Sequence, residues 1–246
     1  MPFTFSHAAI VLPLAKTSKR YWSLTGLVVG SMAPDLEYFS RMKILATYGH
    51  LWLDGLWFNI LISLIYCFVF HLLVRNVLID HLPKFLKSRL VSFTKFNWIK
   101  HFKDNWLVIL ISINIGIYSH LFWDAFTHEW GYFVERISFL RSVWVNIGLE
   151  VKGYKFLQYF SSVLGLITIY FWLIKLPKKD IISVQFDYQF WMLIIVFTSI
   201  VTLLRFVLFP IEIGLGNLIV VPMMSGFIGL MLAGVYKNNL NKKPQV

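Results

Sequence analysis

The sequence predicts an all-α, polytopic membrane protein with about five full transmembrane spans, preceded by a pair of short buried helices. Of the 246 residues, 58% are hydrophobic and 14% are charged, whereas soluble domains contain about 25% charged residues. The mean hydropathy is +0.67, and apolar runs of roughly 20 residues recur, long enough as helices to cross a hydrocarbon core of about 30 Å. We expect a single integral membrane domain over residues 1–246, with a motif-bearing core in 1–175 and two additional spans and a short polar tail in 176–246.

Two short apolar segments come first, at residues 5–15 and 24–35. Each is too short to cross a bilayer, and the second contains Gly26 and Gly30, small residues that let helices pack closely. Pro34 is predicted to end the second helix. Because irregular backbone at membrane depth is tolerated only inside protein or beside a water-filled cavity, we expect a helical hairpin buried among longer spans.

The full spans follow a loop or interfacial segment, which we expect over residues 38–54. Apolar stretches of span length then alternate with polar or charged loops. A tight turn at Phe209–Glu212 joins the last two stretches, and the tail after Lys237 is polar. The predicted spans are about 56–79, 105–127, 157–175, 189–209 and 213–236.

Loop charge predicts the orientation of the chain. Lysine and arginine concentrate in the loops 80–104 and 176–188 and in the tail 237–246. An even number of predicted spans separates these segments, so they lie on one side, which the excess of basic residues identifies as the cytoplasm. The C-terminus is therefore expected to be cytoplasmic, while the segment 38–54 and the mixed-charge loop 129–156 lie outside.

The composition also argues against nucleic-acid binding and against an intrachain disulfide. The net charge of +11 suggests nucleic acid, but no recognised binding motif accompanies it, and cytoplasmic loops account for the excess. We therefore expect no nucleic-acid partner. Cys67 is the single cysteine, so the chain cannot form an intrachain disulfide.

The stretch from Tyr118 to His128 carries the strongest chemical signal. His120, Asp124 and His128 recur at intervals of four residues, and at about 100° per helical residue all three share one face. Ionisable side chains in an apolar span need a partner, a cavity or a cation. Neutral imidazole and carboxylate together suit zinc or another divalent metal. The alternative is a hydrogen-bonded polar cluster that only locks helices together.

The predicted topology brings further ligand candidates to the same, outer side. His7 and Asp35 lie at the outer ends of the two short helices, and His50 lies in the segment that follows. Candidate ligands from separate segments can therefore converge. The simpler alternatives are that His7 bonds a backbone carbonyl and that Asp35 caps the next helix. Glu37 and Asp54 are weaker candidates, either solvated or acting as a general base that activates water.

Three residues of the later spans complete the candidate site. Gln158 and Ser161 begin a span on the outer side, where they can donate hydrogen bonds to the ligands or to a substrate. Arg205 either pairs with Glu212 or binds an anionic substrate. His71 lies toward the cytoplasmic end of its span, and we exclude it from the site.

Several motifs point to a known family. The chain opens with Met-Pro-Phe-Thr-Phe-Ser-His7, continues with Gly30-Ser-Met-Ala-Pro-Asp-Leu-Glu-Tyr-Phe39, and later carries Ser119-His-Leu-Phe-Trp-Asp-Ala-Phe-Thr-His128. With further matching positions through Gly165, these motifs resemble the bacterial membrane family catalogued as domain of unknown function 4184. That family is uncharacterised, so the resemblance implies a fold and a location but no activity.

A second, more distant resemblance concerns the order of His, Pro-Asp, His and His-x-x-x-Asp along the chain. This order is similar to inner-membrane proteins described as metal-dependent hydrolases of the YdjM type, which are in turn suggested to share a metal site with zinc-dependent phospholipases C. The resemblance implies metal ligands at His7, Asp35, His50, His120 and Asp124, with His128 as a further candidate.

We therefore expect a metal-dependent hydrolase in the bacterial inner membrane, with zinc as the first candidate metal and manganese or iron as alternatives. The expected substrate is a phosphoester or similar bond of a membrane lipid or lipid-linked molecule, which would explain a site inside a helical bundle. The runner-up is a non-enzymatic scaffold or binding protein whose His/Asp cluster is structural. Histidine-ligated haem is disfavoured, because His71 lies at the wrong end of its span to pair with His120.

Overall fold

The computed structural model describes residues 3–15, 17, 20–181, 186–209 and 212–241, and of residues 238–241 it describes the backbone alone. The prediction of an all-α polytopic membrane protein is confirmed, because the structure is 76% helical and its described residues include 5 helices long and apolar enough to cross a membrane. The turn at 209–212, the loop 176–188 and the tail 237–246 lie partly outside the described residues.

The five spans agree with the predicted positions to within a few residues at most of their ends. The first consists of α4, a π-helical turn η2 and α5, and the second of α7, which has a non-helical residue at Asn105, with α8 close behind it. The spans are Leu56–His81, Trp98–Arg136, Gly153–Ile174, Tyr188–Leu208 and Leu215–Lys237. Their helices are α4 (Leu56–Val69), η2 (Phe70–Val74), α5 (Arg75–His81), α7 (Trp98–Thr127), α8 (Tyr132–Arg136), α10 (Gly153–Ile174), α11 (Tyr188–Leu208) and α12 (Leu215–Asn241).

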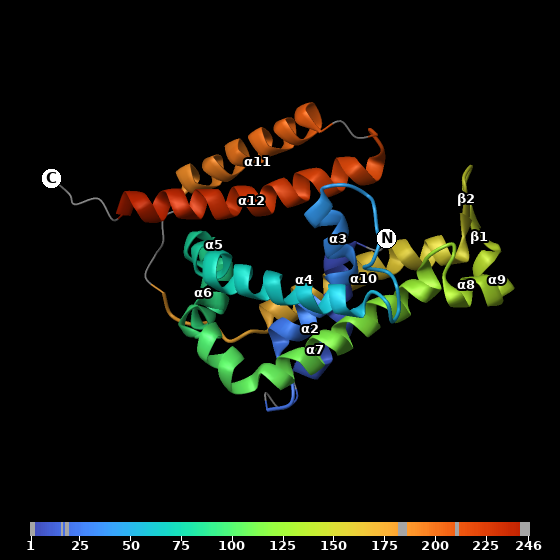
Figure 1. Ribbon diagram of the computed structural model, residues 1–246, viewed down its shortest axis with the longest axis horizontal. Coiled ribbons are helices and arrows are strands. Elements are labelled where there is room, and N and C mark those ends of the chain that lie inside the picture. The colour runs from blue at the N-terminus through green and yellow to red at the C-terminus, as the bar shows by residue number, and fades with distance from the viewer. Residues whose placement is uncertain (1–2, 16, 18–19, 182–185, 210–211, 242–246) are drawn as a thin grey trace. The chain divides into compact units, whose positions relative to one another are not determined.

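The chain forms two compact units that are interleaved in sequence (Figure 1). The first unit contains residues 1–35, 47–64 and 101–175. The second unit contains residues 36–46, 65–100 and 176–246. The predicted short helices belong to the first unit, as η1 (Thr4–His7), α1 (Ala8–Ala15) and α2 (Leu24–Gly30).

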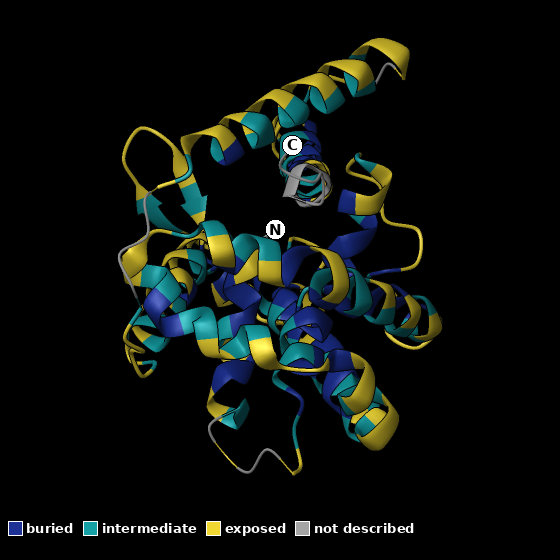
Figure 2. Ribbon diagram, turned by 90° about the vertical axis from the view of Figure 1, so that its left-hand side faces the viewer, coloured by how far each residue is buried: buried dark blue, intermediate teal, exposed yellow. Residues whose placement is uncertain are grey.

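Small residues bring α2 against α7 inside the first unit. A Cβ atom added to Gly30 would lie 2.3 Å from the carbonyl oxygen of Ile113, and one added to Gly116 would lie 2.5 Å from that of Leu27. Real Cβ atoms do not tolerate such distances, so the two helix backbones meet here in a way that only glycine allows. The predicted role of small residues in close helix packing is therefore confirmed, and Leu27, Ser31 and Ile113 beside this contact are buried. Figure 2 shows the buried positions of the described residues in dark blue.

A similar contact joins η1 to α10. A Cβ atom on Gly165 would lie 2.7 Å from the Cβ of Ser6, so this glycine lets the segment before His7 lie directly on the helix. The loop after α7 is more structured than expected. It contains the short helix α9 (Ser138–Arg141) and a hairpin of β1 (Val143–Asn146) and β2 (Glu150–Lys152).

The prediction that Pro34 ends the second helix is wrong. The helix α2 ends at Gly30, and Pro34 lies in the first turn of α3 (Ala33–Arg41). Proline is tolerated in a first turn because the N–H that it lacks has no partner within the helix there. The loop therefore begins after Arg41, at Met42 with a φ of 48°, rather than at residue 38.

The second unit contains the last two spans. Helices α11 and α12 lie side by side (Figure 1), and Asp187 caps the start of α11 by accepting a hydrogen bond from the backbone N–H of Phe190. The Nζ of Lys237 in α12 lies 2.9 Å from Oδ2 of the same aspartate, which ties the two helices together at one end. Two short helices, α6 (Lys84–Leu90) and η3 (Val91–Lys95), follow α5.

Candidate metal centre

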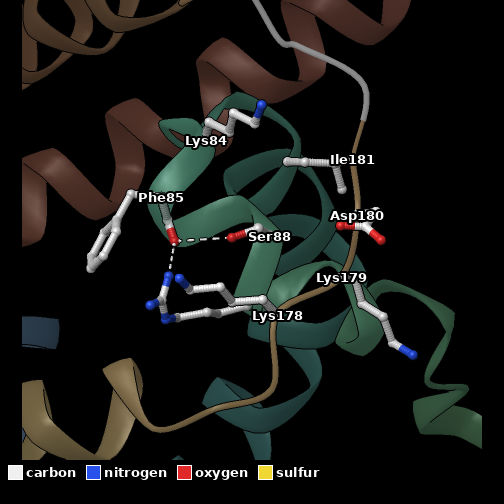
Figure 3. Close-up of a pocket in the computed structure, with 8 residues that line it drawn as sticks. Lys84, Phe85, Ser88, Lys178, Lys179, Asp180 and Ile181 are labelled. Atoms are coloured by element: carbon white, nitrogen blue, oxygen red, sulfur yellow. Dashed lines mark hydrogen bonds between the residues drawn. The ribbon is translucent and has the colours of Figure 1, made fainter.

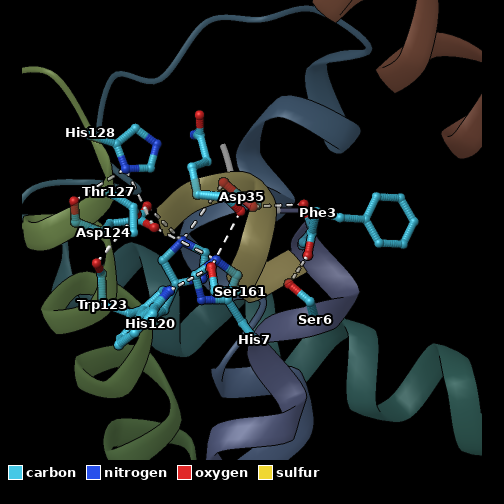
Figure 4. A network of polar contacts seen from close by, with 12 residues as sticks. Phe3, Ser6, His7, Asp35, His120, Trp123, Asp124, Thr127, His128 and Ser161 are labelled. Atoms are coloured by element: carbon cyan, nitrogen blue, oxygen red, sulfur yellow. Dashed lines mark hydrogen bonds and ion pairs between the residues drawn. The ribbon is translucent and has the colours of Figure 1, made fainter. Parts of the chain in front are cut away.

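Helix α7 supplies the centre of a buried polar cluster in the first unit (Figure 4). His120 is fully buried and Asp124 is nearly so, one helical turn apart on the same face. The Nε2 atom of His120 lies 3.2 Å from Oδ2 of Asp124. His128, one turn further on, lies with its Nδ1 atom 3.5 Å from the other carboxylate oxygen of Asp124, and its side chain is about one-third exposed.

His7 reaches the cluster from the N-terminal segment. Its ring stacks on that of His120, with the ring centroids 3.8 Å apart and the planes inclined by 17°. The Nε2 atom of His7 lies 3.6 Å from Oδ1 of Asp124. The close contact at Gly165 holds the preceding residue, Ser6, against α10, which fixes the position from which the imidazole enters the cluster.

Asp35 adds a second carboxylate from the first turn of α3. The residue is fully buried, and its Oδ1 atom lies 3.8 Å from Nε2 of His120 and 3.5 Å from Nε2 of His50. Its other oxygen accepts a 2.7 Å hydrogen bond from the hydroxyl of Thr4. That bond leaves Oδ1 as the oxygen that faces the imidazoles.

His50 completes the cluster from the loop before α4. The buried Asn59 donates a 2.8 Å hydrogen bond from Nδ2 to the carbonyl oxygen of Gly49, which holds the loop in place next to the histidine. Burial by itself lowers the pKa of His50, but the carboxylates of Asp124 and Asp35 outweigh it and raise that pKa to about 9. The two carboxylates thus stabilise positive charge at this point.

Most nitrogen–oxygen distances in the cluster are longer than hydrogen bonds and match those between ligands that share a metal ion. The nitrogen–oxygen pairs lie between 3.2 and 3.8 Å apart, whereas N–H···O bonds have a usual range of about 2.7–3.2 Å. Two ligands at about 2.0–2.1 Å from a tetrahedral zinc ion lie roughly 3.3–3.4 Å apart. Two sets of three ligand atoms lie within 4.8 Å of one another, namely His7 with Asp35 and His120, and His50 with His120 and Asp124.

Several ligand atoms of the cluster are buried without a hydrogen-bond partner among the described residues. These atoms are Nε2 of His7, Nε2 of His120, Oδ1 of Asp35 and both carboxylate oxygens of Asp124. Burying such groups unpaired is costly, and most buried polar atoms in proteins have a partner. One or more divalent cations bound between them would give these atoms partners and balance the two carboxylate charges.

The tautomer of His120 is fixed by the backbone. Its Nδ1 atom lies 2.8 Å from the carbonyl oxygen of Ser31, and a carbonyl only accepts, so Nδ1 carries the proton. In the neutral imidazole the lone pair is therefore on Nε2, the atom that faces both carboxylates. Ser31 directly follows α2, so the close contact of Gly30 with α7 is what brings this carbonyl to the imidazole.

Among the remaining candidates, two belong to the first unit and border the cluster through α10. The hydroxyl of Ser161 accepts a 3.1 Å hydrogen bond from Nε1 of Trp123, the neighbour of Asp124. The Oε1 atom of Gln158 accepts a 2.9 Å bond from Lys155, whereas its buried Nε2 atom has no hydrogen-bond partner in the described part of the chain.

The three other candidates are Asp54, Glu37 and Arg205. Asp54 is exposed, and no ion pair joins it to a cluster histidine within the described residues. Glu37 lies in the second unit, where its Oε1 atom accepts from Nε and Nη2 of Arg41 at 2.9 and 2.8 Å. Arg205, also in the second unit, donates to the carbonyl of Phe209; the described residues show no ion pair between Arg205 and Glu212. Their proposed roles stay predictions.

Three residues that support the cluster were not predicted from the sequence. Thr4 orients one carboxylate, the Ser31 carbonyl fixes the tautomer of His120, and Asn59 holds the loop beside His50. The only signal in the sequence was that Thr4 and Ser31 lie inside the two N-terminal motifs. Asn59 stands out only as an amide within an apolar span.

The fold and the cluster together define a helical integral membrane protein with a buried His/Asp centre. The chain belongs to the family described as Domain of unknown function (DUF4184), which it matches over residues 1–235. This match extends well past Gly165 and includes nearly all of the last two spans. A search of curated proteins and a search of solved structures each found no match.

Proposed function

We propose that the protein is a membrane-embedded, metal-dependent hydrolase that acts on a phosphoester or similar bond of a lipid or lipid-linked substrate. The observation that carries the proposal is the convergence of three Nε2 atoms and two carboxylates, most of them buried without hydrogen-bond partners among the described residues. Imidazole and carboxylate ligands suit zinc best, with manganese and iron as alternatives.

The ligands in this proposal are His7, His120 and Asp124, with Asp35 and His50 completing the site. A bound divalent cation lowers the pKa of water from 15.7 to about 7 and neutralises an attacked phosphoryl group. The chain contributes fixed ligand positions. Thr4 holds the carboxylate of Asp35, and the Ser31 carbonyl keeps the lone pair of His120 on Nε2.

The surroundings of the cluster support a phosphate-bearing substrate. The buried amide nitrogen of Gln158 is a donor with no hydrogen-bond partner in the described residues, and its side-chain oxygen holds the ammonium group of Lys155 at 2.9 Å. An amide donor and a cation held together can bind phosphoryl oxygens. Asp54, four residues after His50 and exposed, is the candidate base in this unit.

The position of the proposed ligands within a span favours a substrate that reaches the site from the lipid phase. His120 and Asp124 lie within a helix of span length, where a water-soluble substrate would have to leave water. The resemblance to the YdjM-type hydrolases supports the same reaction class. The charge of the loops favours a bacterial cytoplasmic membrane with the C-terminus in the cytoplasm.

The first test is the metal content of the detergent-purified protein, measured by inductively coupled plasma mass spectrometry. We expect about one metal ion per chain in the wild type and less than about one tenth of that in His120→Ala, since one lost ligand of a buried site removes most of the affinity. His101→Ala, on the same helix but away from the cluster, should keep the metal. Release of a phosphate-bearing product from lipid substrates should follow the same pattern.

The two outcomes separate the enzyme from its alternative. Bound metal without hydrolysis of any phosphoester lipid would favour a structural centre in a membrane scaffold, since structural zinc sites are closed by four protein ligands. A wild-type protein that binds no metal even after reloading would contradict the proposal.

A further inference from the structure

A cavity of about 280 Å³ lies in the second unit, and none of the residues that line it belongs to the His/Asp cluster (Figure 3). Its walls come from α6 and from the extended segment 178–181, which meet through a 2.8 Å hydrogen bond from the backbone N–H of Lys179 to the carbonyl oxygen of Ser88. That bond joins two segments far apart in the sequence, so the cavity is part of the fold of this unit.

The lining of this cavity is strongly basic. Four basic side chains and a single acidic one border it: Lys84, Arg89, Lys178, Lys179 and Asp180. Within the described residues, no salt bridge to a carboxylate involves any of the three lysines. Like charges gathered around one cavity repel one another, and this repulsion falls when an anion enters.

The guanidinium of Arg89 is held in place at the wall. Its Nη1 atom donates a 2.7 Å hydrogen bond to the carbonyl oxygen of Phe85, and the group lies 4.3 Å from the centre of the Phe85 ring. A fixed guanidinium beside flexible ammonium groups is a combination suited to phosphate, because the planar fork sets orientation and the lysines add charge.

The sequence places the cavity at the ends of spans. Lys84 follows within one helical turn of His81, the last residue of the first span, and Lys178 comes shortly after Ile174, the last residue of the third. Basic residues directly after spans lie at the level of the lipid headgroups. The cavity also has apolar walls, Ile181 and the half-exposed Phe85, that can contact the glycerol and acyl part of a lipid.

We propose that this basic cavity, distinct from the metal centre, binds the phosphate headgroup of an anionic membrane lipid. The site is independent of the proposed hydrolase activity, because none of its lining residues belongs to the metal cluster. The lipid would bridge α6 and the segment 178–181 and so fasten the second unit at the membrane surface.

The test uses the full-length protein in detergent and short-chain lipids below their micelle concentrations. Binding of dihexanoyl-phosphatidylglycerol, dihexanoyl-phosphatidylcholine and inorganic phosphate is measured by microscale thermophoresis. We expect the anionic lipid to bind at least about tenfold more tightly than the zwitterionic lipid. The double variant Lys178→Ala/Lys179→Ala should bind it about 30-fold more weakly, since each basic side chain near a lipid surface contributes roughly a factor of five.

The matched control is Lys95→Ala/Lys100→Ala, which removes the same charge from exposed positions of the second unit outside the cavity. It should bind the anionic lipid like the wild type. Equal losses in both double variants would overturn the proposal, because they would indicate attraction to net charge alone. Inorganic phosphate binding as tightly as the lipid would overturn the lipid as the ligand.

Discussion

Two buried histidines, one in each unit, differ in the charges around them, and this difference bears on which of them suits a metal ion. His120 in the first unit and His71 in the second are both buried, and both stack on a ring, at 3.8 Å on His7 and at 4.5 Å on Trp98. The two imidazoles differ in the charged groups that their ring nitrogens face. His120 faces two carboxylates, whereas the Nδ1 atom of His71 lies 2.9 Å from Nη1 of Arg75.

The neighbouring charge therefore decides the role of each imidazole. Arginine can only donate, so Nδ1 of His71 accepts, and the fixed cation beside it repels any metal ion. Around His120 the two carboxylates have the opposite effect and favour a cation. Of these two buried histidines, only His120 has carboxylates beside it that suit a cation.

The largest effect on this difference between the two histidines is expected when one carboxylate is removed from the His/Asp cluster. Asp124→Asn keeps the size of the side chain but takes away the carboxylate that faces four imidazoles. We expect metal content, measured by elemental analysis of the purified protein, to fall below about one tenth of the wild type. His71→Ala should leave it unchanged. A retained metal in Asp124→Asn would show that the carboxylate is not a ligand.

A smaller effect on metal binding is expected when a side chain that only hydrogen-bonds a proposed ligand is changed. Thr4→Val removes the hydroxyl that donates to Oδ2 of Asp35 while keeping the shape of the side chain. Loss of such a supporting bond lowers metal affinity by about 10–100-fold, which competition with a chelator of known affinity would measure. The control is Thr168→Val in α10, whose hydroxyl bonds only its own helix at Leu164. Equal affinities in both variants would contradict this role.

The smallest effect concerns stability. A metal ion whose free concentration is 100 times its dissociation constant stabilises the folded state by about 2.7 kcal/mol. For a chain of this size, that free energy corresponds to a rise of roughly 5–10 °C in the unfolding midpoint. Chelation should lower the thermal unfolding midpoint of the wild type by this amount, read by scanning fluorimetry in detergent. His71→Ala should show the same drop and Asp124→Asn none. A drop in Asp124→Asn as large as in the wild type would mean that chelation acts elsewhere.

Local patterns were enough to predict most of this architecture. The hydropathy of each span is a property of consecutive residues, so the five spans could be placed from the sequence. The four-residue spacing of His120 and Asp124 predicted their shared face, and the parity of the loops predicted that His7, Asp35 and His50 would meet them. The structure brings all five together.

What could not be predicted depends on contacts between distant residues. The bond of Thr4 to Asp35 and that of Asn59 to Gly49 arise only after separate segments pack, and single residues of these types carry no periodic signal. Pro34 was misread because a proline can equally follow one helix or open the next. The hairpin 143–152 lies in a loop whose mixed composition favours no one structure.

The ligands of the centre are distributed from residue 7 to residue 124, and this has a consequence for biogenesis. While the chain is being inserted, His7 and Asp35 reach the bilayer well before the helix that carries His120 and Asp124. Until then the early carboxylate has neither a cation nor its later imidazole partner at membrane depth. The contacts of His7 and Asp35 with His120 and Asp124 therefore cannot form until about half of the protein has been synthesised, and the proposed metal would be captured late in assembly.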